Sequence, residues 1–403
     1  MLLLLQIAAS TLVGLAAVVC IYHIVLAVVG LVGRRRRRVD RGDASHTFAI
    51  VIPAHNEEGT IERALQSCAS IDYPRESYTV FVVVDNCSDD TADIALRNGA
   101  RCLIRRDGER RGKGFALEWA IPQVLAAGCD AILVLDADCQ IDAQALAVFS
   151  DYLGRGYQVL QAADAVANPE DSATSYILAV ANTLENELFY APKAILGLSV
   201  LLRGTGMVLH RRVLEKHPWR AASIVEDAEY TTGLLEAGIA VRFVSEVRVV
   251  SAFPSGAREL RTQRARWIHG GVRLSKTVGV RLMAQGLFRG RPRLLDAGWT
   301  LMIVSRPFVI AGLLGASLAA AGCWHWTSGV FSRLLVLSVG AILLFYALYC
   351  LAGILLLGLN RRRLVLTLRM PLAIVQYLWL ACSLLAHAAP TSWQRTPRPR
   401  ENS

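Results

Sequence analysis

The sequence predicts an α/β fold with a mostly parallel sheet, attached to a membrane by apolar helices at both ends of the chain. Residues 1–33 contain no charged side chain, and residues 299–389 are mostly Leu, Ala, Val, Ile and Gly. Between them, short apolar runs alternate with helical patterns. Hydrophobic residues make up 54% of the chain and charged residues 19%, whereas soluble domains average about 45–50% and about 25%. This composition excludes a disordered or disulfide-stapled chain and favours a membrane protein over a wholly soluble one.

Residues 1–33 are predicted to form an N-terminal transmembrane anchor. The apolar run is long enough to cross a bilayer, which takes about 20 residues. A cleaved signal peptide would instead carry basic residues before a shorter apolar core. Here five arginines, at 34–38, follow the core. Because positive charge gathers on the cytosolic side, we expect the N-terminus outside and the following domain in the cytosol.

Residues 34–257 are predicted to fold as that cytosolic domain. Near-continuous apolar runs at 48–52, 78–84 and 131–135 are typical of strands covered on both faces. Helical patterns lie between and beside them, near 58–69, 90–98 and 114–127. Such βαβ alternation predicts a mostly parallel sheet. Ligands of such sheets bind beyond the carboxyl ends of the strands.

The charge distribution agrees with a membrane-bound protein and speaks against nucleic-acid binding. From residue 43 to residue 254, 29 Asp and Glu outnumber 18 Lys and Arg, whereas nucleic-acid binding needs a basic surface. The basic residues instead gather beside the apolar segments, as the positive-inside rule predicts. Nine scattered cysteines without a CxxC pair indicate reduced thiols rather than a metal or disulfide framework.

The C-terminal part is predicted to hold interfacial and transmembrane helices. Residues 258–297 mix basic and apolar side chains, which is typical of helices lying on an anionic membrane surface. Residues 298–389 form three apolar segments and residues 390–403 a basic tail. One anchor plus three spans would leave this tail outside, against the positive-inside tendency. It therefore stays open whether one of the four apolar segments does not span.

Acidic residues follow the predicted strands. Asp136 and Asp138 come directly after the run at 131–135. Two carboxylates in this spacing suit a hard divalent cation that also binds substrate phosphates. A DxD taken alone is more typical of solvated loop acids, and the neighbouring motifs shift the balance towards a metal. Asp85 ends another apolar run, where its buried charge needs a partner; a nucleobase N–H is one candidate. At least one of Asp89 and Ser88 is expected to cap the helix that follows.

Three further motifs offer chemistry. Lys113 lies between two glycines, which predicts a flexible basic loop able to approach a phosphate. Glu226 and Asp227 begin a helix, where acids favour the positive N-terminus; a carboxylate in a sugar pocket would also act as general base. The motif Gln263-Arg-Ala-Arg266-Trp267 supplies guanidinium groups suited to a pyrophosphate and an indole suited to a sugar face.

Together these motifs resemble membrane-bound family 2 glycosyltransferases with a GT-A catalytic domain, a group that includes cellulose, chitin and hyaluronan synthases and ceramide glucosyltransferase. The resemblance covers about residues 48–267. Its markers are Pro53-Ala-His-Asn-Glu57, Asp85-Asn-Cys-Ser-Asp-Asp90, Gly112-Lys-Gly114, Asp136-Ala-Asp138, Gly204-Thr-Gly206, Glu226-Asp227 and Gln263-x-x-Arg266-Trp267. Val225 stands where the family usually has Thr, which removes a hydroxyl but keeps both acids.

The resemblance implies a role for each marker residue. It implies Asp227 as catalytic base and a Mg²⁺ or Mn²⁺ ion on Asp138, with Asp136 on the metal or the ribose. The nucleotide-sugar site would consist of Pro53, Glu57, Asp85, Lys113, Asp136, Gln263 and Arg266. The acceptor side would consist of Gly204, Gly206, Glu226 and Trp267.

The function implied is inverting, metal-dependent transfer of a sugar from a UDP-sugar to a membrane lipid or a growing envelope or extracellular glycan. A processive polysaccharide synthase is the first alternative, and a catalytically inactive sugar-nucleotide-binding scaffold the second. The expected location is the inner (plasma) membrane, as a multi-pass protein with its catalytic domain in the cytosol. Envelope-assembly subunits are possible partners.

Overall fold

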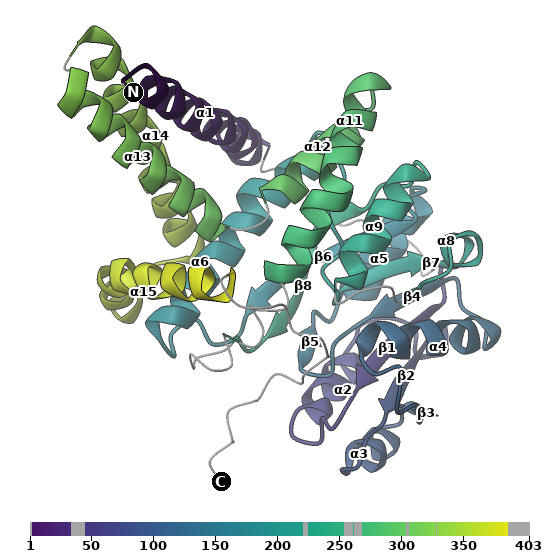
Figure 1. The fold of residues 1–403 in the computed structure, drawn as a ribbon. Coiled ribbons are helices and arrows are strands. Elements are labelled where there is room, and N and C mark those ends of the chain that lie inside the picture. Colours follow the sequence, from purple (N-terminus) through teal and green to yellow (C-terminus); the bar gives the residue numbers. More distant parts are fainter. Residues whose placement is uncertain are drawn as a thin grey trace.

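The computed structural model describes residues 2–33, 45–220, 225–253, 261, 268–303, 306–327 and 329–385. An α/β lobe carries an eight-stranded sheet, and apolar helices from both ends of the chain lie on one side of it (Figure 1). The strands are β1 (Phe48–Ala54), β2 (Tyr78–Asp85), β3 (Arg101–Arg105), β4 (Ala131–Val134), β5 (Cys139–Ile141), β6 (Val159–Val166), β7 (Met207–His210) and β8 (Arg242–Ser251).

The sheet has the order β3-β2-β1-β4-β7-β6-β8-β5. The pairs β1·β2, β1·β4, β2·β3 and β6·β8 are parallel, whereas β7 runs antiparallel to β4 and β6, and β5 runs antiparallel to β8. The predicted α/β fold with a mostly parallel sheet is therefore confirmed. Each antiparallel pair involves β5 or β7, strands that the apolar runs did not predict.

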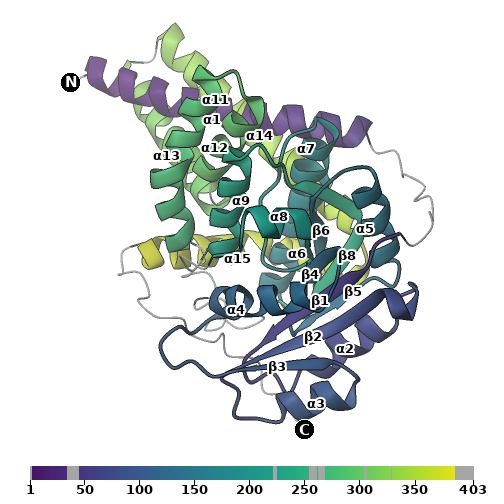
Figure 2. The same ribbon diagram turned by 90° about the vertical axis from the view of Figure 1, so that its right-hand side faces the viewer.

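Helices cover both faces of the sheet (Figure 2). The helices and turns of the lobe are α2 (Ile61–Ala69), η1 (Arg75–Ser77), α3 (Thr91–Arg97), α4 (Lys113–Ala126), α5 (Ala145–Gly154), α6 (Ala173–Glu185), the π-turn η2 (Asn186–Tyr190), α7 (Ala191–Ile195), α8 (Arg211–Lys216) and α9 (Glu226–Glu236). Phe48, Ile50 and Ile52 pack with α2, α3 and α5, whereas Ala49 and Val51 pack with α4, α8 and α9. Because β1 is covered on both faces, its sequence is apolar throughout.

After the lobe come η3 (Ser275–Gly279), α11 (Val280–Phe288), α12 (Pro292–Met302), α13 (Arg306–Thr327), α14 (Val330–Leu357) and α15 (Arg361–Leu385). The apolar segment expected near 299–322 is thus divided between two helices. Pro307 stands in the first turn of α13, where a missing N–H is tolerated. Leu294 and Leu301 of α12 pack with α11 and with Leu235 of the lobe.

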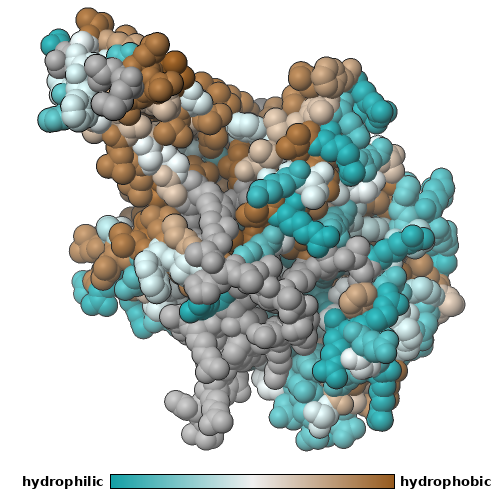
Figure 3. All heavy atoms as spheres, in the orientation of Figure 1, coloured by the Kyte–Doolittle hydropathy of each residue, from teal (hydrophilic) through white to brown (hydrophobic). Residues whose placement is uncertain are grey.

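Within the described residues, four helices are long and apolar enough to cross a membrane by length and composition: α1 (Leu2–Val32), α13, α14 and α15. Ala9 and Val13 of α1 pack with Ala316 of α13 and Val339 of α14. Hydrophobic side chains dominate the surface over these helices and over the tip of α11, while the lobe surface is mostly hydrophilic (Figure 3). The expected attachment of the chain to a membrane is supported by this distribution.

A buried polar contact joins the N-terminal helix to the lobe. The Lys193 ammonium group of α7 lies 3.1 Å from the Asp296 carboxylate of α12, and the Tyr22 hydroxyl of α1 donates to the same carboxylate at 2.6 Å. Lys193 is fully buried. Since a buried charge is tolerated only when paired, this contact fixes how α1 and α12 sit on the lobe.

Candidate active site

Three neighbouring strands deliver polar residues to one edge of the sheet. Ala54 of β1 pairs with Val84 of β2, and the backbone N–H of Leu135 donates to Val51 at 3.0 Å. Because these strands are parallel, the residues that follow them emerge together. Asp85 and Asp136 therefore begin from the same edge, as the sequence predicted for ligand-binding residues in such sheets.

Lys113 and Asp136 meet at the centre of this edge. The Lys113 ammonium group donates to the Asp136 carboxylate and, at 2.7 Å, to the carbonyl oxygen of Gly204. Burial lowers the pKa of Lys113, but the negative charges of Asp136, Glu226 and Asp227 raise it by more. The expectation of a flexible loop around Lys113 is wrong, because Lys113 is the first residue of helix α4. Gly112 occupies the N-cap position of this helix with a φ of 121°.

Asp227 also lies close to Gly204 and Lys113. Its φ is +84°, in the left-handed region that favours glycine, and a Cβ there would lie 3.2 Å from Lys113 Nζ and 3.4 Å from Asp227 Oδ2. Residues from four separate stretches, namely 113, 136, 204 and 227, thus converge. Gly206, with a φ of +63°, is needed for packing, since its Cβ would meet Val249 and Ala162 at 2.8 and 2.9 Å. An acceptor role for Gly206 stays a prediction.

Glu226 and Asp227 open helix α9, as expected. Asp227 Oδ1 accepts from the backbone N–H of Ala228 at 2.8 Å, so the carboxylate is held at the helix start. Burial and the neighbouring Asp227 charge raise the pKa of Glu226 to about 7. Burial also raises the pKa of Asp227, although Lys113 and the Ala228 N–H act against this. A carboxylate with a raised pKa near a cation is a physically reasonable general base.

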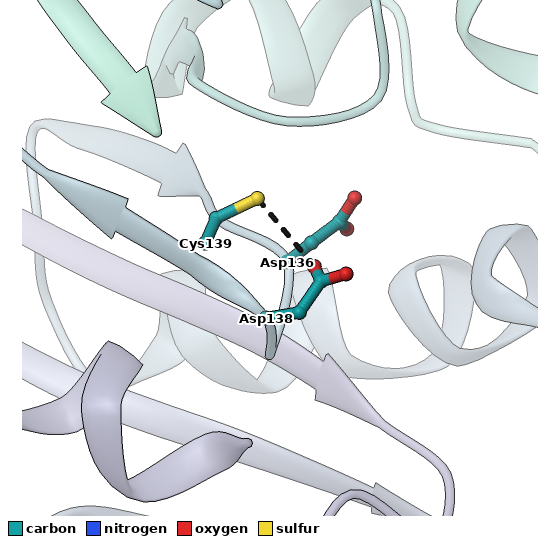
Figure 4. A group of neighbouring side chains, drawn as sticks. All are labelled: Asp136, Asp138 and Cys139. Carbon is teal, nitrogen blue, oxygen red and sulfur yellow. Dashed lines mark hydrogen bonds between the residues drawn. The ribbon is translucent and has the colours of Figure 1, made fainter. Parts of the chain in front are cut away.

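Asp136, Asp138 and Cys139 form a group whose possible ligand atoms all lie within 4.8 Å of one another (Figure 4). The Cys139 thiol lies 3.5 Å from Asp138 Oδ1 and donates to it. Burial, followed by the Asp138 charge, raises the pKa of Cys139 well above its usual value, so the sulfur stays protonated. The remaining donors are carboxylate oxygens, which suit Mg²⁺ or Mn²⁺. The site thus fits the expected divalent ion.

Asp85 has a protein partner that the sequence reasoning did not identify. Arg105 of β3 donates to Asp85 Oδ1 at 2.6 Å, and both side chains are almost fully buried. Asn86 Nδ2 donates to the same oxygen at 3.0 Å. Arg105 also forms an ion pair with Asp107 at 2.7 Å, so its one positive charge compensates two carboxylates. The need of Asp85 for a partner is confirmed; a role in holding a nucleobase stays a prediction.

Pro53 and Glu57 lie at and after the end of β1. Glu57 is held from two sides: its backbone N–H donates to Thr91 Oγ1 at 2.8 Å, and Thr60 donates to its carboxylate at 3.0 Å. The Asp89 carboxylate accepts from two backbone N–H groups, that of Thr91 at 3.1 Å and that of Glu58 at 3.1 Å. Asp89 thus binds the N–H of the first residue of α3, whereas Asp90 occupies the N-cap position without a side-chain cap bond.

Arg203 was missed by the sequence reasoning. Its guanidinium lies 2.8 Å from Asp164 Oδ2, and its backbone N–H donates to Gln161 Oε1 at 2.9 Å. Burial raises the pKa of Asp164 to about 6, although Arg203 lowers it. Among the described residues, Asp164 Oδ1 is a buried oxygen without a hydrogen-bond partner. The sequence did contain a signal for Arg203: it is a charged residue that ends an apolar run directly before Gly204.

Gln263, Arg266 and Trp267 lie outside the described residues. The nearest described residues after them pack against the start of α9: a Cβ at Gly270 would lie 2.4 Å from Val225 Cγ1. The chain therefore returns to the neighbourhood of Asp227 just after this motif.

The mostly parallel sheet, the acids beyond its strands and the carboxylates of α9 are the arrangement of a GT-A glycosyltransferase domain. Residues 46–270 match the model of the family described as glycosyltransferase like family 2. Since the match covers more than half of the chain, the chain belongs to this family.

Curated relatives agree with this assignment. Beta-monoglucosyldiacylglycerol synthase of Trichormus variabilis is 27% identical over 230 residues, which cover 55% of this chain and 48% of the relative. The probable glycosyltransferase YdaM of Bacillus subtilis is 24% identical over 260 residues, or 61% of this chain and 59% of the relative. The chain thus spans about half the length of the curated relatives it matches.

The mannosyltransferase PcManGT of Pyrobaculum calidifontis, solved in complex with GDP-Man and Mn²⁺, has a TM-score of 0.56 and 19% identity, covering 95% of this chain and 98% of that one. At this identity the likeness concerns the fold alone. Because the likeness of fold extends over nearly the whole chain, it includes the helices that follow the lobe.

Proposed function

We propose that this protein transfers a sugar from a UDP-sugar to a membrane lipid, or to a growing envelope or extracellular glycan, with inversion at the anomeric carbon. The observation that carries the proposal is the convergence of Lys113, Asp136 and Asp227 at the backbone of Gly204. It puts a cation and a carboxylate of raised pKa beside the DxD acids at the ligand-binding edge of the sheet.

Asp227 is proposed as the general base. The acceptor hydroxyl oxygen attacks the anomeric carbon from the face opposite the diphosphate, while Asp227 Oδ2 takes the hydroxyl proton. The bond between the anomeric carbon and the diphosphate oxygen breaks, and UDP leaves with its electron pair. Glu226, next to the base, is proposed to hold the acceptor. The raised pKa of Asp227 makes it a better proton acceptor than a solvated carboxylate.

Lys113 is proposed to hold the diphosphate. Its ammonium group donates to the Asp136 carboxylate and to the Gly204 carbonyl oxygen. Asp138 and Asp136 are the residues that would hold Mg²⁺ or Mn²⁺, which when bound supplies positive charge opposite the leaving diphosphate. Pro53, Glu57 and Asp85 are proposed on the nucleoside side, and Gln263, Arg266 and Trp267 on the pyrophosphate and acceptor side.

The location proposed is the inner (plasma) membrane, with the lobe in the cytosol. The five arginines after α1 support this orientation. A lipid acceptor is supported by the helices long enough to span a membrane and by the name of the relative in Trichormus variabilis, a diacylglycerol glycosylating enzyme. A glycan acceptor, built up processively or not, is the alternative that the product analysis below separates.

The experiment uses the purified full-length chain in lipid nanodiscs, incubated with labelled UDP-glucose, UDP-galactose, UDP-N-acetylglucosamine or GDP-mannose in Mn²⁺, Mg²⁺ or EDTA. We expect nucleotide release with one UDP-sugar, dependent on the metal, and label in the lipid extract. Label in an insoluble polymer would support a polysaccharide synthase instead. Binding of UDP-sugars without any release would refute the enzyme and favour the inactive scaffold.

A further inference from the structure

Helix α15 is the least obvious of the four candidate membrane spans. Its 25 residues extend roughly 37 Å at 1.5 Å per residue, which would cross a hydrocarbon core of about 30 Å. Length therefore allows a span. The contacts at its two ends decide otherwise.

The start of α15 is tied to the lobe. Glu170, in the connection between β6 and α6, accepts from Arg363 Nε at 2.8 Å and from Asn360 Nδ2 at 2.7 Å. One turn later, the Thr367 and Tyr176 hydroxyl groups lie 3.1 Å apart. Tyr176 belongs to α6 and packs in one cluster with Ala27, near the end of α1, and Ile354, near the end of α14. The first residues of α15 are thus on the side of the lobe.

The far end of α15 is also on that side. Leu380 and Leu384 pack on Ile268, two residues before Gly270, which fits closely against Val225 at the start of α9. A helix that spans a bilayer places its ends on opposite sides of the hydrocarbon core. The start of α15 contacts Glu170 and Tyr176, and its far end contacts Ile268. Because both ends lie against the lobe, the helix runs along the lobe rather than away from it. Figure 1 shows α15 beside α6, far from the turn between α13 and α14.

The exposed face of α15 suits a lipid headgroup region. The buried residues Leu366, Met370, Ala373 and Leu384 share one face of the helix, since spacings of 4, 3 and 11 residues bring a helix back to the same side. The exposed apolar side chains Leu368, Leu372, Val375 and Trp379 lie on the opposite face, and the exposed Arg361, Arg362 and Arg369 lie on that face or at its flank. In a span, the exposed Arg369 would face hydrocarbon roughly 12 Å from the helix start, which is unfavourable. In an in-plane helix it reaches the lipid phosphates.

We propose that α15 lies in the membrane–water interface on the side of the lobe, with its exposed face on lipid headgroups, and that of the four candidate helices α1, α13 and α14 cross the membrane. This arrangement goes beyond the proposed function and does not depend on it. It also places the basic residues 395–400 on the same side as the arginines that follow α1, in agreement with the positive-inside rule.

Depth measurement tests the proposal on the full chain. Spin labels are attached to single cysteines replacing Leu368, Leu372, Val375 or Trp379, in a background in which the exposed Cys350 and Cys382 are serine. The protein is reconstituted in phosphatidylcholine vesicles containing phosphatidylglycerol, and collision with oxygen and with a water-soluble nickel complex gives each depth. Leu344, exposed near the middle of α14, is the control that must be deep.

We expect all four α15 labels at one shallow depth and the Leu344→Cys label near the bilayer centre. A profile that deepens to a maximum at residue 372, or α15 labels as deep as the control, would overturn the proposal. A second measurement fuses green fluorescent protein or alkaline phosphatase after Ser403 of the full chain. Fluorescence without phosphatase activity is expected, and the reverse pattern contradicts the in-plane helix.

Discussion

Lys113 at the start of α4 and Asp136 after β4 form an ion pair across 23 residues of sequence. The pair neutralises two groups that the proposed reaction needs for different partners: the lysine for a diphosphate and the aspartate for a divalent ion. Donor binding must therefore exchange this internal pair for two external ones.

Replacing Asp227 with Asn should remove the base while preserving the shape of the site. Transfer is expected to fall by about 10²–10⁴-fold, the usual contribution of general base catalysis. Donor affinity, measured by titration with a labelled UDP-sugar, should change little because the hydrogen bond from the Ala228 N–H to residue 227 can persist. Equal losses of affinity and turnover would show that Asp227 holds the donor instead.

Activity should rise with pH over a range above that of a solvated carboxyl group, because the base works only when deprotonated and burial raises the pKa of Asp227. Burial also raises the pKa of the neighbouring Glu226, to about 7. Folding stability has the opposite dependence: acids with a raised pKa in the folded state contribute more stability as the pH falls through that value. Replacing Glu226 with Gln removes a like charge, so the rising limb of the kcat/KM profile should move to lower pH. An unmoved limb contradicts the assignment.

Replacing Asp138 with Asn should abolish the metal dependence of nucleotide binding. The substitution keeps the size of the side chain but removes the charge that attracts a divalent ion. Titration of UDP in Mn²⁺ and in EDTA should then give the same weak affinity. Glu215→Gln is the control, since this exposed carboxylate on α8 pairs only loosely with Arg211 at 3.2 Å. Retention of metal-dependent binding by the Asp138 variant would refute the metal site.

Replacing Gly204 with Ala should impair catalysis more than stability. The new Cβ would press on Lys113 Nζ and Asp227 Oδ2, and the left-handed backbone would cost roughly 1–2 kcal/mol. Gly128→Ala is a matched control, because Gly128 has a φ of +88° with no atom within 4 Å of its Cβ position. Both variants should lose similar thermal stability, and activity should fall only in the first. A parallel loss of activity in both would indicate a general effect of backbone strain.

Replacing Arg105 with Ala should destabilise the lobe by about 3–5 kcal/mol, because it leaves the buried charge of Asp85 with less compensation. Thermal unfolding monitored by thiol-reactive dye gives the change. Arg155→Ala removes an exposed pair with Asp151 and is expected to change stability by less than about 1 kcal/mol. Similar effects of the two substitutions would mean that the Asp85–Arg105 pair contributes no more than a surface pair.

The strands of the parallel half could be predicted because they are contiguous apolar runs bounded by polar residues. The run at 131–135, for example, became Ala131–Val134. Arg105 could not be assigned to Asp85, since β3 is a partly exposed edge strand whose sequence, Arg-Cys-Leu-Ile-Arg, has no apolar pattern. Arg203 and Asp164 likewise meet only through the pairing of distant elements. Local patterns thus predict which residues are polar at a strand end, but not which of them contact each other.

The close fit between Gly270 and Val225 has an evolutionary consequence. Val225 occupies the volume that any side chain at position 270 would require. A substitution at either position therefore constrains which residues the other position can accept. A threonine at 225 has nearly the same shape and would be accepted, whereas a larger residue at 270 would demand compensation across the contact. Descendants of this sequence should therefore show correlated substitutions at the two positions.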